Sequence, residues 1–153
     1  MQIKFILILI LLLLNIYAKT DLNSTKITAD SFEYNDLKHY TYFKGNVKIY
    51  TKKDILFADS VYVFFNKDKT PIKYILKGNV NFNIFIQTKK YIGKGDKIIL
   101  EPLKDKITII NNAYLEDKTT GQKIKGDKIF FDKKNGFSSV FGKKNRPVTF
   151  IIN

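Results

Sequence analysis

A two-residue motif recurs along the chain and constrains the fold more than any other feature of the sequence. Gly45-Asn46, Gly78-Asn79 and Asn111-Asn112 begin thirty-three residues apart. After each motif the first and third residues are apolar and the residue between them varies, which is typical of a strand with one face turned inward. Gly and Asn tolerate a positive φ, so we interpret the motif as a turn that comes just before each strand. The inward positions are Val47 and Ile49, Val80 and Phe82, Ala113 and Leu115, and, in a degraded fourth copy, Val148 and Phe150.

A second motif, a small residue followed by Asp, alternates with the first one. The second and fourth residues after each Asp are apolar or aromatic, which again predicts a strand with an inward face. We interpret each Asp as a residue that opens a strand and accepts backbone N–H bonds in a turn. The copies of the motif are Ala29-Asp30, Ala58-Asp59, Gly95-Asp96 and Gly126-Asp127. The inward positions that follow them are Phe32 and Tyr34, Val61 and Val63, Ile98 and Leu100, and Ile129 and Phe131.

The two motifs divide the chain into four copies of a unit that contains two strands and the turn between them. Short polar connections are expected at residues 35–38, 66–69, 102–105 and 133–136. Hairpin-like connections between alternating strands predict an antiparallel all-β domain. Parallel solenoids also repeat, but their units are usually regular in length. The intervals between successive Asp residues are 29, 37 and 31 residues here, which favours antiparallel hairpins.

The N-terminus has the layout of a secretory signal peptide. Lys4 precedes an unbroken apolar run over residues 5–14, and Ala18 offers a small residue at a cleavage site. The run is short for a membrane span, although an uncleaved anchor helix is the alternative interpretation. We therefore predict a signal peptide over residues 1–18 and a single domain over residues 19–153. The absence of cysteine fits a domain held by its core alone in the bacterial periplasm.

The chain is strongly basic, with a net charge of +13. Such a charge suits an anionic partner, namely a nucleic acid, an anionic lipid or a phosphorylated glycolipid. Every basic residue except Arg146 is a lysine, so a biased composition explains the charge equally well. Nucleic acid is the weakest of these partners, because many aromatic residues fall on inward positions and the signal peptide directs the chain away from the cytoplasm.

The sequence contains no recognisable enzyme motif, so we predict that the protein is not an enzyme. His39 is the only histidine and falls in a turn region, and there is no cysteine. This composition excludes a soft-ligand metal cluster. The recurrent Asp residues stand alone, without the additional carboxylates that a calcium loop needs. We expect neither a metal nor a cofactor.

The motifs resemble those of the OstA-like periplasmic family, and in particular its lipopolysaccharide-transport bridge proteins of the LptA type. The resemblance covers nearly all of the predicted mature chain. It is most specific in "NNAYLEDKTTGQKIKGDKIFFD" at residues 111–132, and it includes "ITADSFEY" at 27–34, "FKGNVKIYTKKDILFADSVYV" at 43–63 and "KNRPVTFII" at 144–152. Asn111 stands where the family usually has Gly, and Pro102 stands where it often has an inward apolar residue.

The resemblance implies an antiparallel open β-jellyroll with a V-shaped cross-section. It also implies a non-enzymatic periplasmic carrier that shields the acyl chains of lipopolysaccharide on their way from the inner to the outer membrane. The implied partners are lipopolysaccharide through its lipid A, further copies joined head to tail through the terminal strands, and inner- and outer-membrane transport components with similar jellyroll domains. The residues expected to line the acyl-chain groove are Ile27, Phe32, Phe43, Val47, Ile49, Val61, Val63, Phe65, Phe82, Ile98, Leu100, Leu115, Ile129, Phe131 and Phe150.

Two alternatives remain at this stage. The chain could be the membrane-anchored periplasmic partner of the same pathway, which shares the fold and keeps its N-terminal helix. It could also be a structural or adhesive β-domain with a closed core, because alternation alone does not distinguish a closed core from an open groove.

Overall fold

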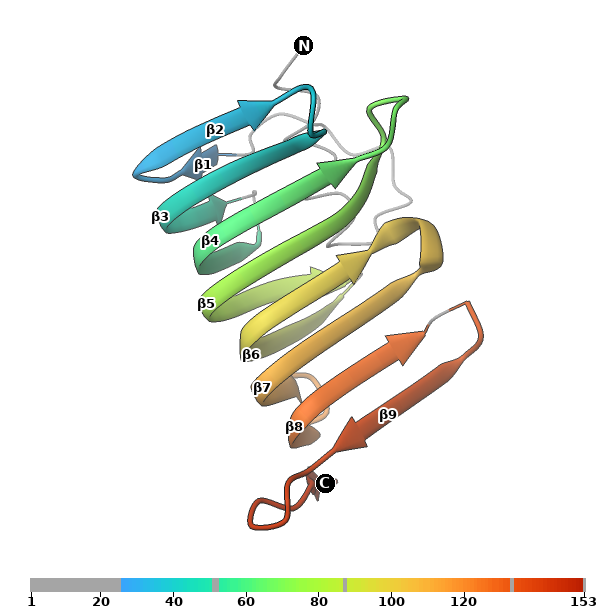
Figure 1. Cartoon of the computed structure of the whole chain (residues 1–153). Helices are drawn as coiled ribbons and strands as arrows, with labels where there is room; N and C mark the ends of the chain where they lie inside the picture. Colours follow the sequence, from blue (N-terminus) through green and yellow to red (C-terminus); the bar gives the residue numbers. More distant parts are fainter. Residues whose placement is uncertain (1–25, 51–52, 87, 133, 153) are drawn as a thin grey trace.

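The computed structural model describes residues 26–50, 53–86, 88–132 and 134–152, which form one antiparallel sheet of ten strands (Figure 1). This architecture confirms the predicted all-β class. Among the described residues, no helix is long and apolar enough to cross a membrane. The predicted signal peptide, residues 1–18, lies outside the described residues. The strands are β1 (Lys26–Thr28), β2 (Ser31–Asn35), β3 (Tyr40–Tyr50), β4 (Ile55–Phe65), β5 (Pro71–Ile86), β6 (Lys89–Glu101), β7 (Lys106–Asp117), β8 (Lys123–Asp132), β9 (Phe137–Phe141) and β10 (Thr149–Ile151), and a 3₁₀ helix, η1 (Pro102–Lys104), follows β6.

Each long strand is bent, so that its two halves belong to two different walls of the fold (Figure 1). At one end of the sheet, β2 pairs with the first half of β3 and β1 pairs with the second half. At the other end, β9 and β10 pair with the two halves of β8. We call the half that contains β2 and β9 the first wall, and the half that contains β1 and β10 the second wall. No described strand joins β1 or β2 to β9 or β10, so the sheet stays open rather than closing into a barrel.

The bend lies where the recurrent motifs lie. The strand register shifts between Lys44 and Val47, between Lys77 and Val80 and between Ile110 and Ala113, which are the positions of the three Gly-Asn-type motifs. A register shift of this kind is a β-bulge, which bends a strand without ending it. The prediction that each motif is a turn ahead of a strand was therefore wrong, because the motifs lie in the middle of long strands.

The Asp residues hold this bend through side chains of the neighbouring strand. Asn46 donates from Nδ2 to Asp30 at 2.9 Å, Asn79 donates to Asp59 at 3.1 Å, and Asn112 donates to Asp96 at 3.1 Å. The expected backbone N–H donors are thus replaced by asparagine amides. The prediction that each Asp opens a strand holds for Asp30, which precedes β2, and was wrong for the other copies, because Asp59, Asp96 and Asp127 lie inside β4, β6 and β8. In the fourth copy, Asp127 pairs instead with Lys143 at 3.0 Å and with Arg146 at 3.8 Å.

The glycine of the motif is required by the carboxylate beside it. A Cβ atom on Gly78 would lie 2.1 Å from Oδ2 of Asp59, and the φ of Gly78 is +78°. Gly45 has the same relation to Asp30, at 2.2 Å and +80°. In the third copy Asn111 replaces glycine with a φ of 58°, a conformation that Asn tolerates better than most residues. The strain and the collision together explain why this position recurs as glycine.

The predicted connections are confirmed as turns. Turns follow β2, β4 and β8, and η1 with Asp105 forms the connection after β6. Each of these connections lies at the far edge of the first wall, away from the bend, because the strands that precede them end there.

Candidate functional site

The inward side chains form continuous rows that run across the sheet from one end to the other. In the first wall, directly paired residues make one row nearest the bend and a second row farther from it; a third row follows the second wall. The first row is Phe32, Phe43, Val61, Leu76, Ile98, Ile109, Ile129 and Val140. The second row is Tyr34, Thr41, Val63, Tyr74, Leu100, Ile107, Phe131 and Ser138. The third row is Ile27, Ile49, Leu56, Phe82, Gly93, Leu115, Ile124 and Phe150.

The residues predicted from the sequence to line a groove all lie in or beside these rows, and they differ in exposure. Most of them are buried, four are half-buried against this core, and one at each end of the sheet is exposed. The buried residues are Phe43, Val47, Ile49, Val61, Val63, Phe65, Ile98, Leu100 and Ile129. The half-buried residues are Ile27, Phe82, Leu115 and Phe131. The exposed residues are Phe32 and Phe150, at 48% and 56%.

Several interior residues were missed by the sequence reasoning, which assigned inward positions mainly by counting forward from each motif. Leu76 lies two residues before Gly78, and Ile109 lies two residues before Asn111. Both are buried, at 0% and 1% exposure. Counting backward from each motif with the same period of two would have found them. The other missed residues of the three rows are Leu56, Tyr74, Ile107, Ile124 and Val140.

Tyr74 is the most unusual member of the interior. Its side chain is fully buried, and no described residue offers its hydroxyl group a hydrogen-bond partner. Burial raises the pKa of Tyr74 well above its ordinary value, so the phenol is neutral at physiological pH. A buried polar group without a partner is uncommon in folded proteins and calls for a physical explanation.

At both ends of the sheet, the outermost described strands are paired on one side only, and apolar side chains are exposed. At the β1–β2 end, Phe32 and Tyr34 are 48% and 43% exposed. At the β9–β10 end, Phe137, Phe150 and Ile151 are exposed. The edge strands match in length, because β2 and β9 have five residues each and β1 and β10 have three each. The chain passes from the second wall to the first through β1 and β2, and it returns from the first to the second through β9 and β10. The two edges therefore run in opposite directions.

The sequence model of the family described as "LptA/(LptD N-terminal domain) LPS transport protein" matches residues 26–137. This range begins at β1 and reaches the first residue of β9, so it includes all the bent strands of the interior. The chain belongs to this family of lipopolysaccharide transport proteins. The resemblance inferred from the sequence motifs is thereby confirmed.

A solved structure supports the fold. The crystal structure of LptH, described as the LptA-homologous periplasmic component of the lipopolysaccharide transport device of Pseudomonas aeruginosa, matches with a TM-score of 0.68. The match covers 85% of this chain and 95% of LptH, at 16% sequence identity. Since so low an identity shows the fold alone, it confirms the open jellyroll. No curated protein sequence matches the chain.

The buried carboxylates of this family member have structural partners. Oδ1 of Asp54 accepts a hydrogen bond from the backbone N–H of Phe85 at 2.7 Å. A hydrogen bond from Asn135 lowers the pKa of Asp132, and Lys106 lies 3.5 Å from the same carboxylate. Within the described part of the chain, no cluster of three or more His, Cys, Asp or Glu side chains is arranged to hold a metal ion. These carboxylates therefore stabilise turns and strand ends.

Proposed function

We propose that the protein is a non-enzymatic periplasmic carrier that shields the acyl chains of lipopolysaccharide in its interior. The supporting observation is that the inward rows run between two open ends of the sheet, that the first row is apolar at every position, and that Phe32 and Phe150 are exposed at these ends. Membership of a lipopolysaccharide transport family supports the same proposal. In this proposal the acyl chains lie against the inward residues predicted from the sequence, and no chemical reaction takes place.

The energetics of the interior set a condition on this proposal. Removing acyl chains from water yields about 0.8 kcal/mol per methylene group, so a ten-methylene segment gains about 8 kcal/mol. Val61 and Ile129 are already fully buried in the chain described here. The two walls must therefore move apart when lipid enters, and part of this gain offsets the loss of interior contacts. The open sheet permits such a movement, because no described strand links its two ends.

The hydroxyl group of Tyr74 is available to such a ligand. Its row lies in the first wall, on the same face as Val63 and Leu100. Acyl chains carry ester or amide carbonyl groups, which accept hydrogen bonds from a phenol. A bound acyl group would thus satisfy a donor that has no described partner in the chain alone.

Head-to-tail assembly is the second part of the proposal. Because the two edges run in opposite directions and match in length, β9 of one copy can pair antiparallel with β2 of the next, and β10 can pair with β1. Exposed edges with unpaired backbone groups recruit other strands. The interior rows of neighbouring copies would then become continuous. The components at the two membranes would offer similar edges, as the family resemblance implies.

Site-specific photo-crosslinking tests the acyl-chain proposal. A photoreactive residue at Phe82 or Leu100, both on interior rows, should capture lipopolysaccharide. Lys48 and Lys97 are matched controls on the outer face of the same sheet, and they should capture much less. Equal labelling at the four positions would contradict the assignment of the interior as the lipid site.

Direct measurements distinguish two alternative functions from the carrier function proposed above. The complete burial of Val61, Leu76 and Ile129 favours a closed structural or adhesive domain as the second candidate. Failure of the interior positions to capture lipopolysaccharide, in a correctly folded protein, would support that candidate. The membrane-anchored partner of the same pathway is tested by N-terminal sequencing of the protein purified from cells, because the anchor would retain residues 1–18.

A further inference from the structure

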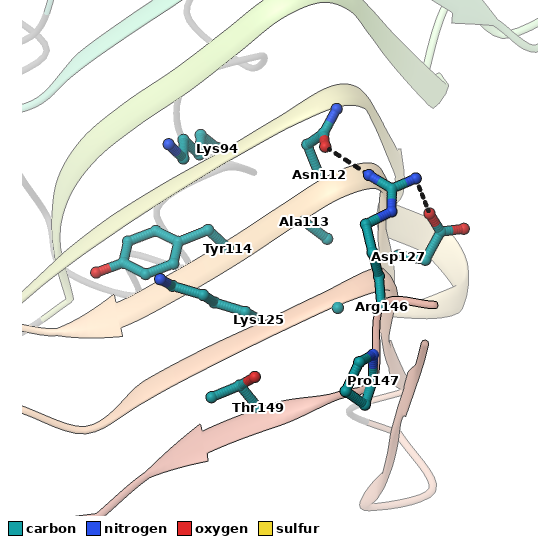
Figure 2. A pocket seen from close by; sticks show the side chains of 10 residues that line it. Lys94, Asn112, Ala113, Tyr114, Lys125, Asp127, Arg146, Pro147 and Thr149 are labelled. Carbon is teal, nitrogen blue, oxygen red and sulfur yellow. Dashed lines mark hydrogen bonds and ion pairs between the residues drawn. The ribbon is translucent and has the colours of Figure 1, made fainter. Parts of the chain in front are cut away.

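A pocket of 610 Å³ lies on the outer face of the second wall, close to the β9–β10 end (Figure 2). Lys94, Tyr114, Lys125 and Thr149 line it, and they occupy directly paired positions on β6, β7, β8 and β10. The four side chains therefore form a single cross-strand row. The pocket is outside the region to which the acyl chains are assigned.

The sheet itself separates this pocket from the interior. Gly93, Leu115 and Ile124 are the sequence neighbours of the pocket residues, and they belong to the third interior row. Successive residues of a strand face opposite sides of a sheet. A ligand held by the side chains of Lys94, Tyr114, Lys125 and Thr149 would therefore lie on the opposite face of the sheet from an acyl chain that packs on the third interior row.

The turn before β10 closes one side of the pocket. Lys143 and Arg146 pair through two backbone hydrogen bonds of 2.9 Å, which fold the turn. The guanidinium group of Arg146 then reaches back across the strands, to Asn112 at 3.3 Å and to Asp127 at 3.8 Å (Figure 2). These contacts fix Arg146 and Pro147 at the rim.

Positive charge in the pocket is not compensated locally. Lys94 and Lys125 approach the ring of Tyr114 from the two neighbouring strands, and each ammonium nitrogen lies 5.8 Å from the ring centroid. Among the described residues, neither ammonium group forms an ion pair. The carboxylate in the lining, Asp127, is neutralised by Lys143 and Arg146.

Glu116, the carboxylate that Tyr114 contacts, is also occupied. Tyr114 donates its hydroxyl hydrogen to Glu116 at 2.5 Å, and Lys118 pairs with Glu116 at 3.0 Å. The hydrogen bond to Glu116 raises the pKa of Tyr114 to about 12, so the ring stays neutral. Tyr114 therefore contributes a flat, uncharged surface between two ammonium groups that form no ion pair with any described residue.

We infer that this outer pocket binds a phosphate group, either free or as a monoester, held between Lys94 and Lys125 above Tyr114. A phosphate monoester carries between one and two negative charges at neutral pH, which matches two unpaired ammonium groups better than a carboxylate does. The hydroxyl group of Thr149 and the guanidinium group of Arg146 lie on the same lining and can donate to phosphate oxygens. The source of the group is either a phosphorylated sugar or free phosphate.

Nuclear magnetic resonance titration of the ¹⁵N-labelled protein tests the inference. Inorganic phosphate, glucose 1-phosphate and acetate are added separately at constant ionic strength. Inorganic phosphate and glucose 1-phosphate should shift the amide signals of Tyr114, Lys125 and Thr149 in a saturable way, and acetate should not. An affinity for glucose 1-phosphate at least tenfold above that for phosphate identifies a phosphorylated sugar as the source; equal affinities identify free phosphate.

A matched pair of double variants separates a site from general attraction to a basic protein. Lys94→Gln with Lys125→Gln should weaken phosphate binding at least tenfold. Lys48→Gln with Lys128→Gln removes the same charge from exposed outer positions outside the pocket lining, and it should leave the affinity unchanged. Lys128 is a close match because its ammonium nitrogen also lies 5.8 Å from an aromatic ring centroid, that of Phe141. Equal weakening by the two double variants, or no saturable shift in the unaltered protein, would overturn the inference.

Discussion

Replacing Tyr74 with phenylalanine should make the lipid-free protein more stable and its lipid complex weaker. The tyrosine hydroxyl is fully buried and has no described partner. Leaving such a group unsatisfied costs about 1–3 kcal/mol of folding free energy. Tyr74→Phe removes the hydroxyl group and keeps the ring, so we expect the free energy of unfolding to rise by about 1–2 kcal/mol.

Urea denaturation followed by circular dichroism measures this gain. With a slope of about 2 kcal/mol per molar urea, the midpoint should rise by about 0.5–1 M. Tyr114→Phe is the matched control, because its hydroxyl group is engaged with Glu116 at 2.5 Å. That control should lower the midpoint. Opposite signs for the same chemical change would show that the difference comes from hydrogen bonding rather than from hydrophobicity.

The same substitution should alter stability at alkaline pH. An unfolded tyrosine titrates near 10.0, whereas burial raises the pKa of folded Tyr74 above that value. Above pH 10 the unfolded state loses this proton first, so the protein loses stability as the pH rises toward the folded pKa. The loss reaches about 1.4 kcal/mol per pH unit. Tyr74→Phe lacks this contribution, so its advantage over the unaltered protein should widen above pH 10.

Tyr74→Phe should weaken lipid binding, although it stabilises the lipid-free protein. If Tyr74 donates to an acyl carbonyl group, Tyr74→Phe should capture lipopolysaccharide about tenfold less well while being more stable, a trade-off often found where function uses an unsatisfied group. A lower urea midpoint for Tyr74→Phe would refute the reasoning, because it would show that the hydroxyl group already has a partner in the free protein.

Three further outcomes are expected from the same structure. Gly78→Ala should lower the free energy of unfolding by at least about 1 kcal/mol in urea denaturation, because the φ of Gly78 is +78° and the new Cβ would lie 2.1 Å from the Asp59 carboxylate. An unchanged urea midpoint would contradict this explanation of the bend. Phe32→Asp places a carboxylate at an exposed end of the interior, so the circular dichroism spectrum should be unchanged while lipopolysaccharide transfer to a second copy falls at least tenfold. Normal transfer would count against passage of lipid through that end. Deleting residues 148–153 removes the edge strand of the second wall. Light scattering should then show a mostly monomeric protein at concentrations where the mass of the full chain increases. Equal masses for the truncated and the full chain would argue against assembly through that edge.

The sequence was sufficient to predict which side chains face inward, because alternation with a period of two is a local property of an extended chain. Val61, Val63, Ile98 and Leu100 were assigned in this way, and all four are buried. The turns at the far edge of the first wall were equally predictable, since short polar segments between alternating strands have few other interpretations. The family assignment followed from the same motifs and is confirmed by the match over residues 26–137.

The place of the Gly-Asn motif was not predictable from local reasoning. A positive φ at Asn46 or Asn79 fits a turn between two strands as well as a bulge within one strand. A turn and a bulge differ in whether the strand remains paired on both sides of the motif. β2 pairs with β3 up to Lys44 and β1 pairs with β3 beyond Val47, so β3 continues through the motif as one strand. The partner of each Asp was hidden for the same reason, because Asp59 and Asn79 are twenty residues apart and meet only when the strands pair.

What the sequence determined alone is which residues are extended, which of them face inward and the family to which they belong, because these depend on residue order over a few positions. The tertiary structure decided where the strands bend, which side chains are covered, and which edges remain free. Tyr74 shows the difference. The alternation of residues before Gly78 predicts that Tyr74 faces inward. Whether its hydroxyl group finds a hydrogen-bond partner depends on the residues packed around it, including Val63 and Leu100 on the neighbouring strands. Burial and hydrogen-bond satisfaction are properties of the whole packed interior, and no local pattern encodes them.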